Sequence, residues 1–412
     1  MADPASSDSH YAQSQALFAR AGKVIPGGIY GHVSPAVCLP GASPYYAVSA
    51  DGCRYRDVDG HEYIDYMCGY GPIILGYQHP AVEAATEKQR RDGDCFNHPT
   101  ARMVELAERL IGLVDIAAWA VFGKNGSDMT TWAVQLAREA TGHKKILTVD
   151  GAYHGIDPWC TPGHGGLIEE DRAHIHTFPW NDGAMLEQCL EANRGEVAAV
   201  IVTPFHHPAF GDCVMPADGF FARLEAACRR HGALIIVDDI RAGFRLHTGG
   251  SHRVFGLNPD IICFCKALAN GYALSAAVGR EELRLAAGRV FLTGSYWNGA
   301  VGMAAALATL DEIERGAVPS QLEKVGRRFR EGLIQLGERH GHPVVCSGPV
   351  AIPFMRFAED RGFQRLQRFC AEAMRAGVFL HPHHNWFLCA AHTEAVIDET
   401  LDRLGPVFAG LE

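Results

Sequence analysis

The chain has 412 residues, of which 48% are hydrophobic and 20% are charged, and its formal net charge at pH 7 is −10. That length allows one large domain and a smaller one, and the composition is that of a globular protein in water. The negative charge argues against nucleic acid as a partner, and the lack of any apolar run of about 18 residues argues against a membrane span.

The compartment is predicted from the cysteines and from the N-terminal stretch. The chain has 13 cysteines without a paired framework, which favours reduced thiols. The first residues show neither the basic segment nor the apolar segment of a secretory signal. We therefore expect a cytoplasmic protein.

The predicted elements fall into three successive parts. Residues 1–66 contain a short helix and small antiparallel strands, whereas in residues 67–310 strand-like runs alternate with helical ones. Residues 311–412 contain helices and a few strands. Alternating strands and helices predict an α/β fold with a mainly parallel central sheet wrapped by helices. We expect 67–310 to be the large domain, and the N- and C-terminal parts to form a smaller α+β domain.

A strand, a turn and a helix are predicted between Ala118 and Gly142. The Gly126-Ser127 pair opens the helix, where backbone N–H groups, a hydroxyl and the positive end of the helix dipole are available to a phosphate. Such a pair is also an ordinary helix cap. Together with an acid and a lysine further along the chain, it favours a phosphate site.

That acid and that lysine follow two buried strands. The apolar run of Ile235–Phe244 ends in Asp238-Asp239, and Lys266 follows a second apolar run within Ile262–Tyr272. Strands of this kind deliver their next residues to the carboxyl edge of a parallel sheet, where ligands bind. Pyridoxal phosphate (PLP) needs a carboxylate for its ring nitrogen and a lysine to form an imine. The residues therefore indicate a PLP enzyme.

Two histidine clusters, His206-His207 and His381–His384, invite a metal assignment. Neither has zinc-type spacing to a second ligand pair, and no C-x-x-C sequence occurs. We therefore expect no metal site.

The chain resembles a known family through many segments that occur in the family's order. These are Ile25–His32, Asp57–Val82, Asn125–Asp128, Gly151–Gly155, the Asp238 and Lys266 segments, Thr293–Ala306 and Ala390–Thr393. They resemble class III, fold-type I PLP enzymes of the glutamate-1-semialdehyde aminomutase branch, and the chain is also similar to aminotransferases that act on amino sugars in aminoglycoside biosynthesis. The resemblance implies PLP as cofactor, a homodimer and small-molecule amino donors and acceptors.

The resemblance also implies roles for the reactive residues. Lys266 would form the Schiff base and shuttle the proton, and Asp238 would pair with the pyridinium nitrogen. Tyr153, counted with them as catalytic, would stack on one ring face beside His154, and Ile240 would lie against the other. The ordinary alternatives are that Asp238 caps a loop and that Tyr153 belongs to the core.

The phosphate of the cofactor has its own implied ligands. Asn125, Gly126 and Ser127 would bind it from the start of the helix. Ser295 would reach it from the partner subunit, although a turn residue is the plain alternative.

Departures from the family's pattern carry the information on the substrate. The aminomutase holds its substrate carboxylate with an arginine near the position of Ser34, and no arginine lies between Ala21 and Gly52. Arg241 and Arg245 follow the acid pair Asp238-Asp239. They are candidate anchors for a carboxylate, or else members of structural ion pairs. Hydroxyls, imidazoles and aromatic rings suit a neutral or cationic polyol. The expected substrate contacts are Tyr30, His32, Tyr70, His383, His384 and Trp386.

These observations predict a PLP-dependent aminotransferase of the oxo- or amino-sugar type. An isomerase, either an aminomutase or an epimerase at an amine-bearing carbon, would use the same lysine and stays open. A non-catalytic protein with a PLP fold is the third alternative, against which the intact Lys266 and Asp238 argue.

Overall fold

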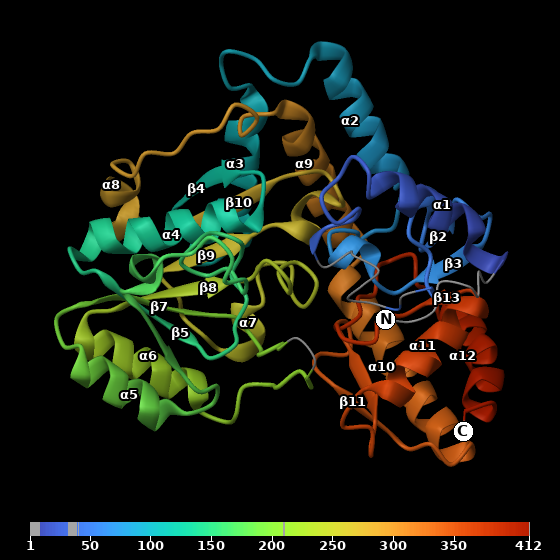
Figure 1. The fold of residues 1–412 in the computed structure, drawn as a ribbon. Coiled ribbons are helices and arrows are strands. Elements are labelled where there is room, and N and C mark those ends of the chain that lie inside the picture. The colour runs from blue at the N-terminus through green and yellow to red at the C-terminus, as the bar shows by residue number, and fades with distance from the viewer. Residues whose placement is uncertain (1–8, 32–38, 40, 209–210, 412) are drawn as a thin grey trace.

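The computed structural model describes residues 9–31, 39, 41–208 and 211–411. Figure 1 shows the central sheet and its helices on one side, and the N-terminal strands beside the C-terminal helices on the other. Within the described residues, no helix is both long enough and apolar enough to cross a membrane.

The central sheet has seven strands in the order β4-β10-β9-β8-β7-β5-β6. Strand β10 runs antiparallel to both of its neighbours, and the other pairs are parallel, which confirms the predicted mainly parallel sheet. The strands are β4 (Trp119–Gly123), β5 (Lys145–Val149), β6 (Ile175–Phe178), β7 (Val197–Val202), β8 (Leu234–Asp238), β9 (Ile261–Phe264) and β10 (Ser275–Gly279).

Helices cover both faces of this sheet because its strands are apolar on both sides. All six residues of β7 are buried, and the neighbours Val200 and Ile201 belong to two different apolar clusters. Helix α6 (Phe220–His231) packs into the first cluster and α4 (Gly126–Thr141) into the second. A strand buried on both faces reads as a continuous apolar run, which made it predictable from the sequence.

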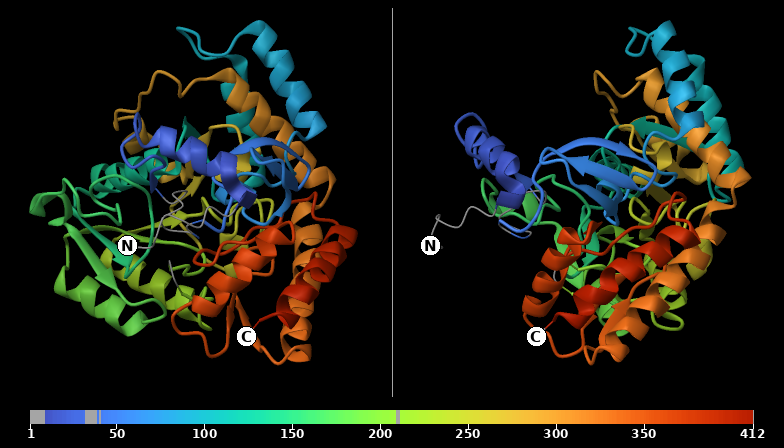
Figure 2. Two further views of the ribbon diagram at one scale, coloured as in Figure 1. Left: turned by 45° about the vertical axis from the view of Figure 1, so that its right-hand side comes forward. Right: turned by 90° about the vertical axis from the view of Figure 1, so that its right-hand side faces the viewer.

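The two ends of the chain share a second sheet, of order β1-β2-β3-β13. Strand β13 (Val378–Phe379) pairs in parallel with β3 (Glu62–Asp65), next to β1 (Ala47–Asp51) and β2 (Arg54–Asp57). The N-terminal strands and the C-terminal helices therefore lie side by side, as both views of Figure 2 show. The domain boundaries drawn from the sequence stay a prediction.

The remaining elements complete the chain between and around these sheets. They are α1 (Ala12–Ala21), α2 (Pro80–Asp92), α3 (Ala101–Leu113), α5 (Gly183–Ala192), α7 (His252–Phe255), α8 (Arg284–Ala287), α9 (Ala300–Arg315), α10 (Val318–Arg339), β11 (Val344–Ser347), β12 (Phe354–Phe357), α11 (Gln364–Arg375) and α12 (Glu394–Ala409), with short 3-10 helices at Ser9–Tyr11, Cys68–Tyr70, Glu169–Arg172, Lys266–Ala269 and Glu281–Leu283.

Candidate active site

The predicted acid and lysine meet at one edge of the central sheet. Strand β8 ends at Asp238, and the neighbouring parallel strand β9 pairs with it through Cys263 opposite Asp238. Lys266 follows two residues after β9 ends. Both side chains are thus delivered at the carboxyl ends of adjacent strands, where open α/β sheets bind their ligands.

Asp238 is held in place by a short chain of hydrogen bonds. Its Oδ2 lies 2.8 Å from Nδ1 of His154, and its Oδ1 accepts the N–H of Ile240 at 3.2 Å. The other imidazole nitrogen, Nε2, lies 3.0 Å from Oγ1 of Thr148 on β5. His154 and Thr148 are both buried, so the carboxylate has a fixed orientation toward the cleft.

Asp239 points the other way, as expected for neighbouring residues at a strand end. Its carboxylate accepts the N–H of Ser251 at 2.7 Å and the hydroxyl of the same residue. Burial raises the pKa of Asp239 to about 7. This carboxyl group therefore serves the local structure.

Lys266 occupies a strained position and has a depressed pKa. Its φ is 43°, in the left-handed region, and its Nζ donates a hydrogen bond to the carbonyl oxygen of Tyr70 at 2.9 Å. Burial is the main cause that lowers the lysine's pKa to about 8, and the nearby Arg241 lowers it further. A lysine of this kind is partly uncharged near neutral pH, as an imine-forming amine must be.

The start of α4 lies beside this edge and has the features of a phosphate site. Oδ2 of Asp128 caps the turn by accepting the N–H of Asn125 at 2.8 Å, so the first N–H groups of the helix remain available. A Cβ atom on Gly126 would lie 2.6 Å from Cδ1 of Ile240, and one on Gly155 would lie 2.4 Å from Oγ of Ser127. The two glycines allow this close packing of loop, helix start and strand end.

Two further residues expected at the cofactor lie on exposed segments. The side chain of Tyr153, next to His154, is 43% exposed, so one face of its ring is available to a ligand. Ser295 is exposed in the loop between α8 and α9. The roles predicted for Tyr153 and Ser295 stay predictions.

Residues 68–71 and 381–392, which we call the tail wall, contact the sheet edge through Lys266 and Arg241, and we call the place where the two meet the cleft. The ring of Tyr70 stands edge-on to His384, with 5.3 Å between centroids. Nε2 of His384 lies 3.1 Å from Nη1 of Arg241, and the same nitrogen of Arg241 donates to Oδ1 of Asn385. Burial lowers the pKa of His384 well below its usual value, so this imidazole is neutral.

Arg245 is a structural residue and not a carboxylate anchor. Its guanidinium donates to the carbonyl oxygens of Leu388 at 2.6 Å and Gly71 at 2.5 Å, and it lies over the ring of Phe387. The side chain is fully buried. The structure thus separates the two arginines: Arg245 ties the tail wall together, whereas Arg241 lies beside Lys266.

Several predicted substrate contacts lie elsewhere. Trp386 is fully buried in the core and donates from Nε1 to the carbonyl of His381, so the prediction that it contacts substrate is wrong. Tyr30 is 76% exposed in a separate groove beside α1. His383 lies against Gln367 and Phe363 of the C-terminal part, and His32 lies outside the described residues.

Sequence reasoning missed Thr148, and it named both His206 and His207 as candidates for the contact to the phenolic oxygen of the cofactor. The signal for Thr148 was a lone polar residue near the end of an apolar strand. Burial, with the charge of Arg241 as the second cause, lowers the pKa of His207 well below its usual value. His206 instead stacks on Trp180. His207 is thus the member of the pair that lies close to the cleft.

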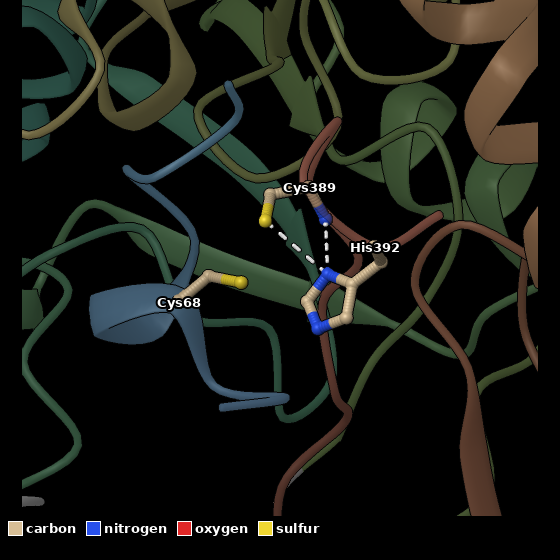
Figure 3. Close-up of side chains that lie close together, drawn as sticks. All are labelled: Cys68, Cys389 and His392. Atoms are coloured by element: carbon tan, nitrogen blue, oxygen red, sulfur yellow. Dashed lines mark hydrogen bonds between the residues drawn. The ribbon is translucent and has the colours of Figure 1, made fainter. Parts of the chain in front are cut away.

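A buried cluster of two sulfurs and an imidazole lies within the tail wall. Among the described residues, Cys68, Cys389 and His392 form the one group whose ligand atoms could hold a metal, all within 4.8 Å of one another (Figure 3). Nδ1 of His392 already accepts the N–H of Cys389 at 2.9 Å and lies 3.2 Å from its Sγ. The lone pair is therefore engaged, and the absence of a metal site stays a prediction.

One groove in the described part of the chain lies away from Lys266. It has a volume of about 940 Å³ and lies between the segment 245–248 and the start of α10. The chemistry of the side chains, and not the size of a cavity, identifies the cleft at the sheet edge as the candidate site.

Comparisons with known proteins agree with this site. The family model Aminotransferase class-III matches residues 40–406. The aminopentol aminotransferase of Sphingopyxis macrogoltabida is 43% identical over 95% of this chain and 93% of the relative. A glutamate-1-semialdehyde 2,1-aminomutase of Chloroflexus aurantiacus is 34% identical, over 97% of each chain.

One solved structure is similar over nearly the whole chain. The FumI protein of Sphingopyxis sp. MTA144, in its PLP internal aldimine form, has a TM-score of 0.95 at 41% identity and covers 97% of this chain and 98% of its own. The resemblance drawn from the sequence and the fold-type I architecture that it implied are confirmed.

Proposed function

The chain belongs to the class III aminotransferases, a family of PLP-dependent enzymes, and we propose that its characteristic substrate is an amino sugar or a related amino polyol. The observation that carries this proposal is the chemistry of the tail wall. Tyr70 and the neutral His384 pack against each other there, and the neutral His207 lies close to Arg241. Uncharged groups that donate and accept hydrogen bonds suit the hydroxyls of such an amine.

The similarity to an aminopentol aminotransferase supports the same class of substrate. The relative's name denotes an amine that carries five hydroxyl groups. A sugar and an open-chain polyol present the same hydroxyls to a protein, so the proposal covers both.

The described residues fit PLP at the sheet edge. Gly126, Ser127 and the turn at Asn125 would hold the phosphate with N–H groups and a hydroxyl, because their backbone lies at the open start of α4. Ile240, packed against Gly126, would contact one face of the ring, and Tyr153 the other. Ser295 of a partner subunit would add a hydroxyl to the phosphate.

Asp238 would face the ring nitrogen, because Asp239 is already engaged by Ser251. His154 donates to Asp238 and would hold the carboxylate in place for the ring nitrogen. When bound, PLP supplies a carbonyl group that takes the amine and a ring that accepts the electrons released at the amine-bearing carbon.

Lys266 would do the proton chemistry. Its Nζ would carry the proton between the amine-bearing carbon of the substrate and the aldehyde carbon of the cofactor. The carbonyl of Tyr70, which accepts from Nζ at 2.9 Å, would orient the amine between transfers. Because the lysine's pKa is about 8, the group can both accept and return a proton near neutral pH.

An isomerase would need the same groups, and several relatives at 31–34% identity are aminomutases. The two activities differ in their products. An amino donor added alone converts the cofactor of a transaminase lastingly to its amine form. The absorbance band of the imine between lysine and cofactor then disappears. An isomerase exchanges the proton at the amine-bearing carbon with deuterated solvent and keeps its original absorbance.

We further propose that the active unit is a homodimer in the cytoplasm. The exposed loop that carries Ser295 and the exposed ring of Tyr296 support a subunit contact at this place. Sedimentation at assay concentration tests it, and a fully active monomer would contradict it.

The substrate proposal is tested with purified holoenzyme and three classes of amine. The panel contains amino sugars and amino polyols, simple ω-amino acids, and glutamate-1-semialdehyde, with Lys266→Ala as the inactive control. We expect the highest kcat/KM for hydroxylated amines. Robust turnover of the semialdehyde, or no reaction with any hydroxylated amine, would refute the substrate class and leave the PLP assignment intact.

A further inference from the structure

Arg241 is a cation in the cleft whose described side-chain partners are neutral. Its Nη1 donates to Oδ1 of Asn385 and contacts Nε2 of His384, an imidazole that is itself uncharged. Burial lowers the pKa of Arg241 to about 10, so the charge is held in a desolvated place. A charge in such a place is normally matched by an opposite one.

Two other arginines of this chain have acid partners. Arg229 donates to both oxygens of Asp260, and Arg356 to both oxygens of Asp212. The acid that acts on Arg241 is Asp238, whose oxygens already accept hydrogen bonds from His154 and Ile240. Among the described residues, the structure therefore shows no carboxylate bound to Arg241.

The position of Arg241 relative to the reactive lysine follows from a chain of contacts. Nζ of Lys266 donates to Tyr70, the ring of Tyr70 packs against His384, and His384 contacts Arg241. One corner of the guanidinium, Nη1, makes the contacts with His384 and Asn385. The edge formed by Nε and Nη2 has the geometry that takes both oxygens of one carboxylate.

We propose that Arg241 anchors the carboxylate of the amino-acid or 2-oxo-acid co-substrate, in the same cleft that takes the hydroxylated amine. This inference rests on the proposed function, since a transaminase must bind two different partners in turn. The amine would occupy the neutral side of the cleft at Tyr70 and His384. The acid would use the charge of Arg241, so one site would serve both partners without an ion pair that must first be broken.

Two rival roles for Arg241 predict different losses. If it only held Asn385 and the tail wall in place, its removal would lower stability and impair both half-reactions. If it neutralised the phenolic oxygen of the cofactor, its removal would change cofactor affinity and absorbance, again in both half-reactions. A carboxylate anchor affects one half-reaction alone.

The test compares Arg241→Met, Arg241→Lys and the exposed control Arg368→Met as purified holoenzymes. Each half-reaction is followed by stopped-flow absorbance of the cofactor, first with a hydroxylated amine and then with pyruvate or 2-oxoglutarate. Binding of acetate and succinate, which cannot react, is measured separately by calorimetry. Circular dichroism and the thermal midpoint check that each variant is folded.

For Arg241→Met we expect kcat/KM for the 2-oxo acids to fall by about 10²- to 10³-fold, which is the loss typical of a truncated charge pair. Carboxylate binding should weaken in parallel, and the amine half-reaction should change by less than about 3-fold. The kcat/KM of Arg241→Lys for the 2-oxo acids should lie between those of the parent and of Arg241→Met. Lysine keeps the charge but loses the two parallel donors of the guanidinium. Arg368→Met should match the parent.

Equal losses in both half-reactions would overturn the proposal, and so would unchanged kinetics with 2-oxo acids. If the parent enzyme rejects every hydroxylated amine and still reacts with a 2-oxo acid, the proposed function fails. The role of Arg241 can then still be measured with any accepted amine.

Discussion

The two sides of the cleft are built in different ways. In the strand-end wall, Asp238 and Lys266 follow adjacent strands that share a hydrogen-bonded ladder, and His154, from the loop after β5, holds Asp238. The tail wall is assembled from segments far apart in the chain, which Arg245 joins through the carbonyls of Gly71 and Leu388. We infer that substitutions in the first impair chemistry, and that substitutions in the second alter stability or substrate choice.

The largest effect is expected where two neighbouring carboxylates of the strand-end wall are compared. Asp238→Asn should lower kcat by about 10²- to 10⁴-fold, because a neutral amide no longer favours the protonated cofactor ring. Asp239→Asn should cost less than about 10-fold, since its pKa of about 7 already makes this group partly neutral. Steady-state kinetics of the two variants decide. A larger loss for Asp239→Asn would reverse the assignment.

The next prediction concerns stability, because the strand-end wall holds a desolvated lysine. The pKa of Lys266 is lowered from its usual 10.5 to about 8, so the folded apoprotein loses stability at neutral pH by holding the charge. At about 1.4 kcal/mol per pKa unit, Lys266→Met should raise the free energy of unfolding by up to about 3 kcal/mol at pH 7.

The sign of this effect gives a pH test. The penalty is fully present below the folded pKa of about 8 and fades as the pH rises toward 10.5, where the unfolded lysine also loses its proton. Urea unfolding of both apoproteins at pH 7 and pH 10 measures it. A gap between them that widens at pH 10 would contradict the prediction.

A smaller loss is expected at His154, which acts through Asp238 as a positioning residue. His154→Ala should lower kcat by about 10- to 100-fold, the value of one hydrogen bond to a charged group. His154→Gln should recover part of it, because the amide can donate to Asp238. The absorbance spectrum of the bound cofactor should change with the loss of kcat, whereas a purely structural role would leave that spectrum unmoved and change the thermal midpoint alone.

The smallest effect is expected in the tail wall at Trp386. Trp386→Phe keeps the packing and loses the hydrogen bond from Nε1 to His381, so the free energy of unfolding should fall by about 1 kcal/mol. The KM for hydroxylated amines should stay the same. A several-fold rise in that KM would contradict this prediction. It would instead support a direct contact between Trp386 and the substrate.

The contrast between the walls also explains what could be predicted from the sequence. Asp238 and Lys266 follow apolar strands, and Gly126 opens an amphipathic helix, so local patterns place all three at the sheet edge. The separation of Asp238 from Asp239 follows from the alternation along a strand. These features depend on near neighbours in the chain.

The tail wall depends on contacts that no local pattern contains. The same composition of rings and imidazoles describes Trp386, which is buried, and His384, which faces Arg241. Which arginine binds carbonyls and which stays in the cleft was equally open, because Arg241 and Arg245 follow the same strand. The two roles can be told apart only from the folded structure, in which Arg245 donates to the carbonyl oxygens of Gly71 and Leu388.

These contacts have a consequence for how the protein is made in the cell. Arg245 donates to Leu388, and Arg241 contacts His384 and Asn385. Neither arginine therefore has these partners until residues 384–388 have been synthesised. Strand β13 must likewise arrive before the N-terminal sheet is finished. A chain still on the ribosome can form the central sheet, but we expect it to capture its cofactor stably only after residues 378–388 have emerged.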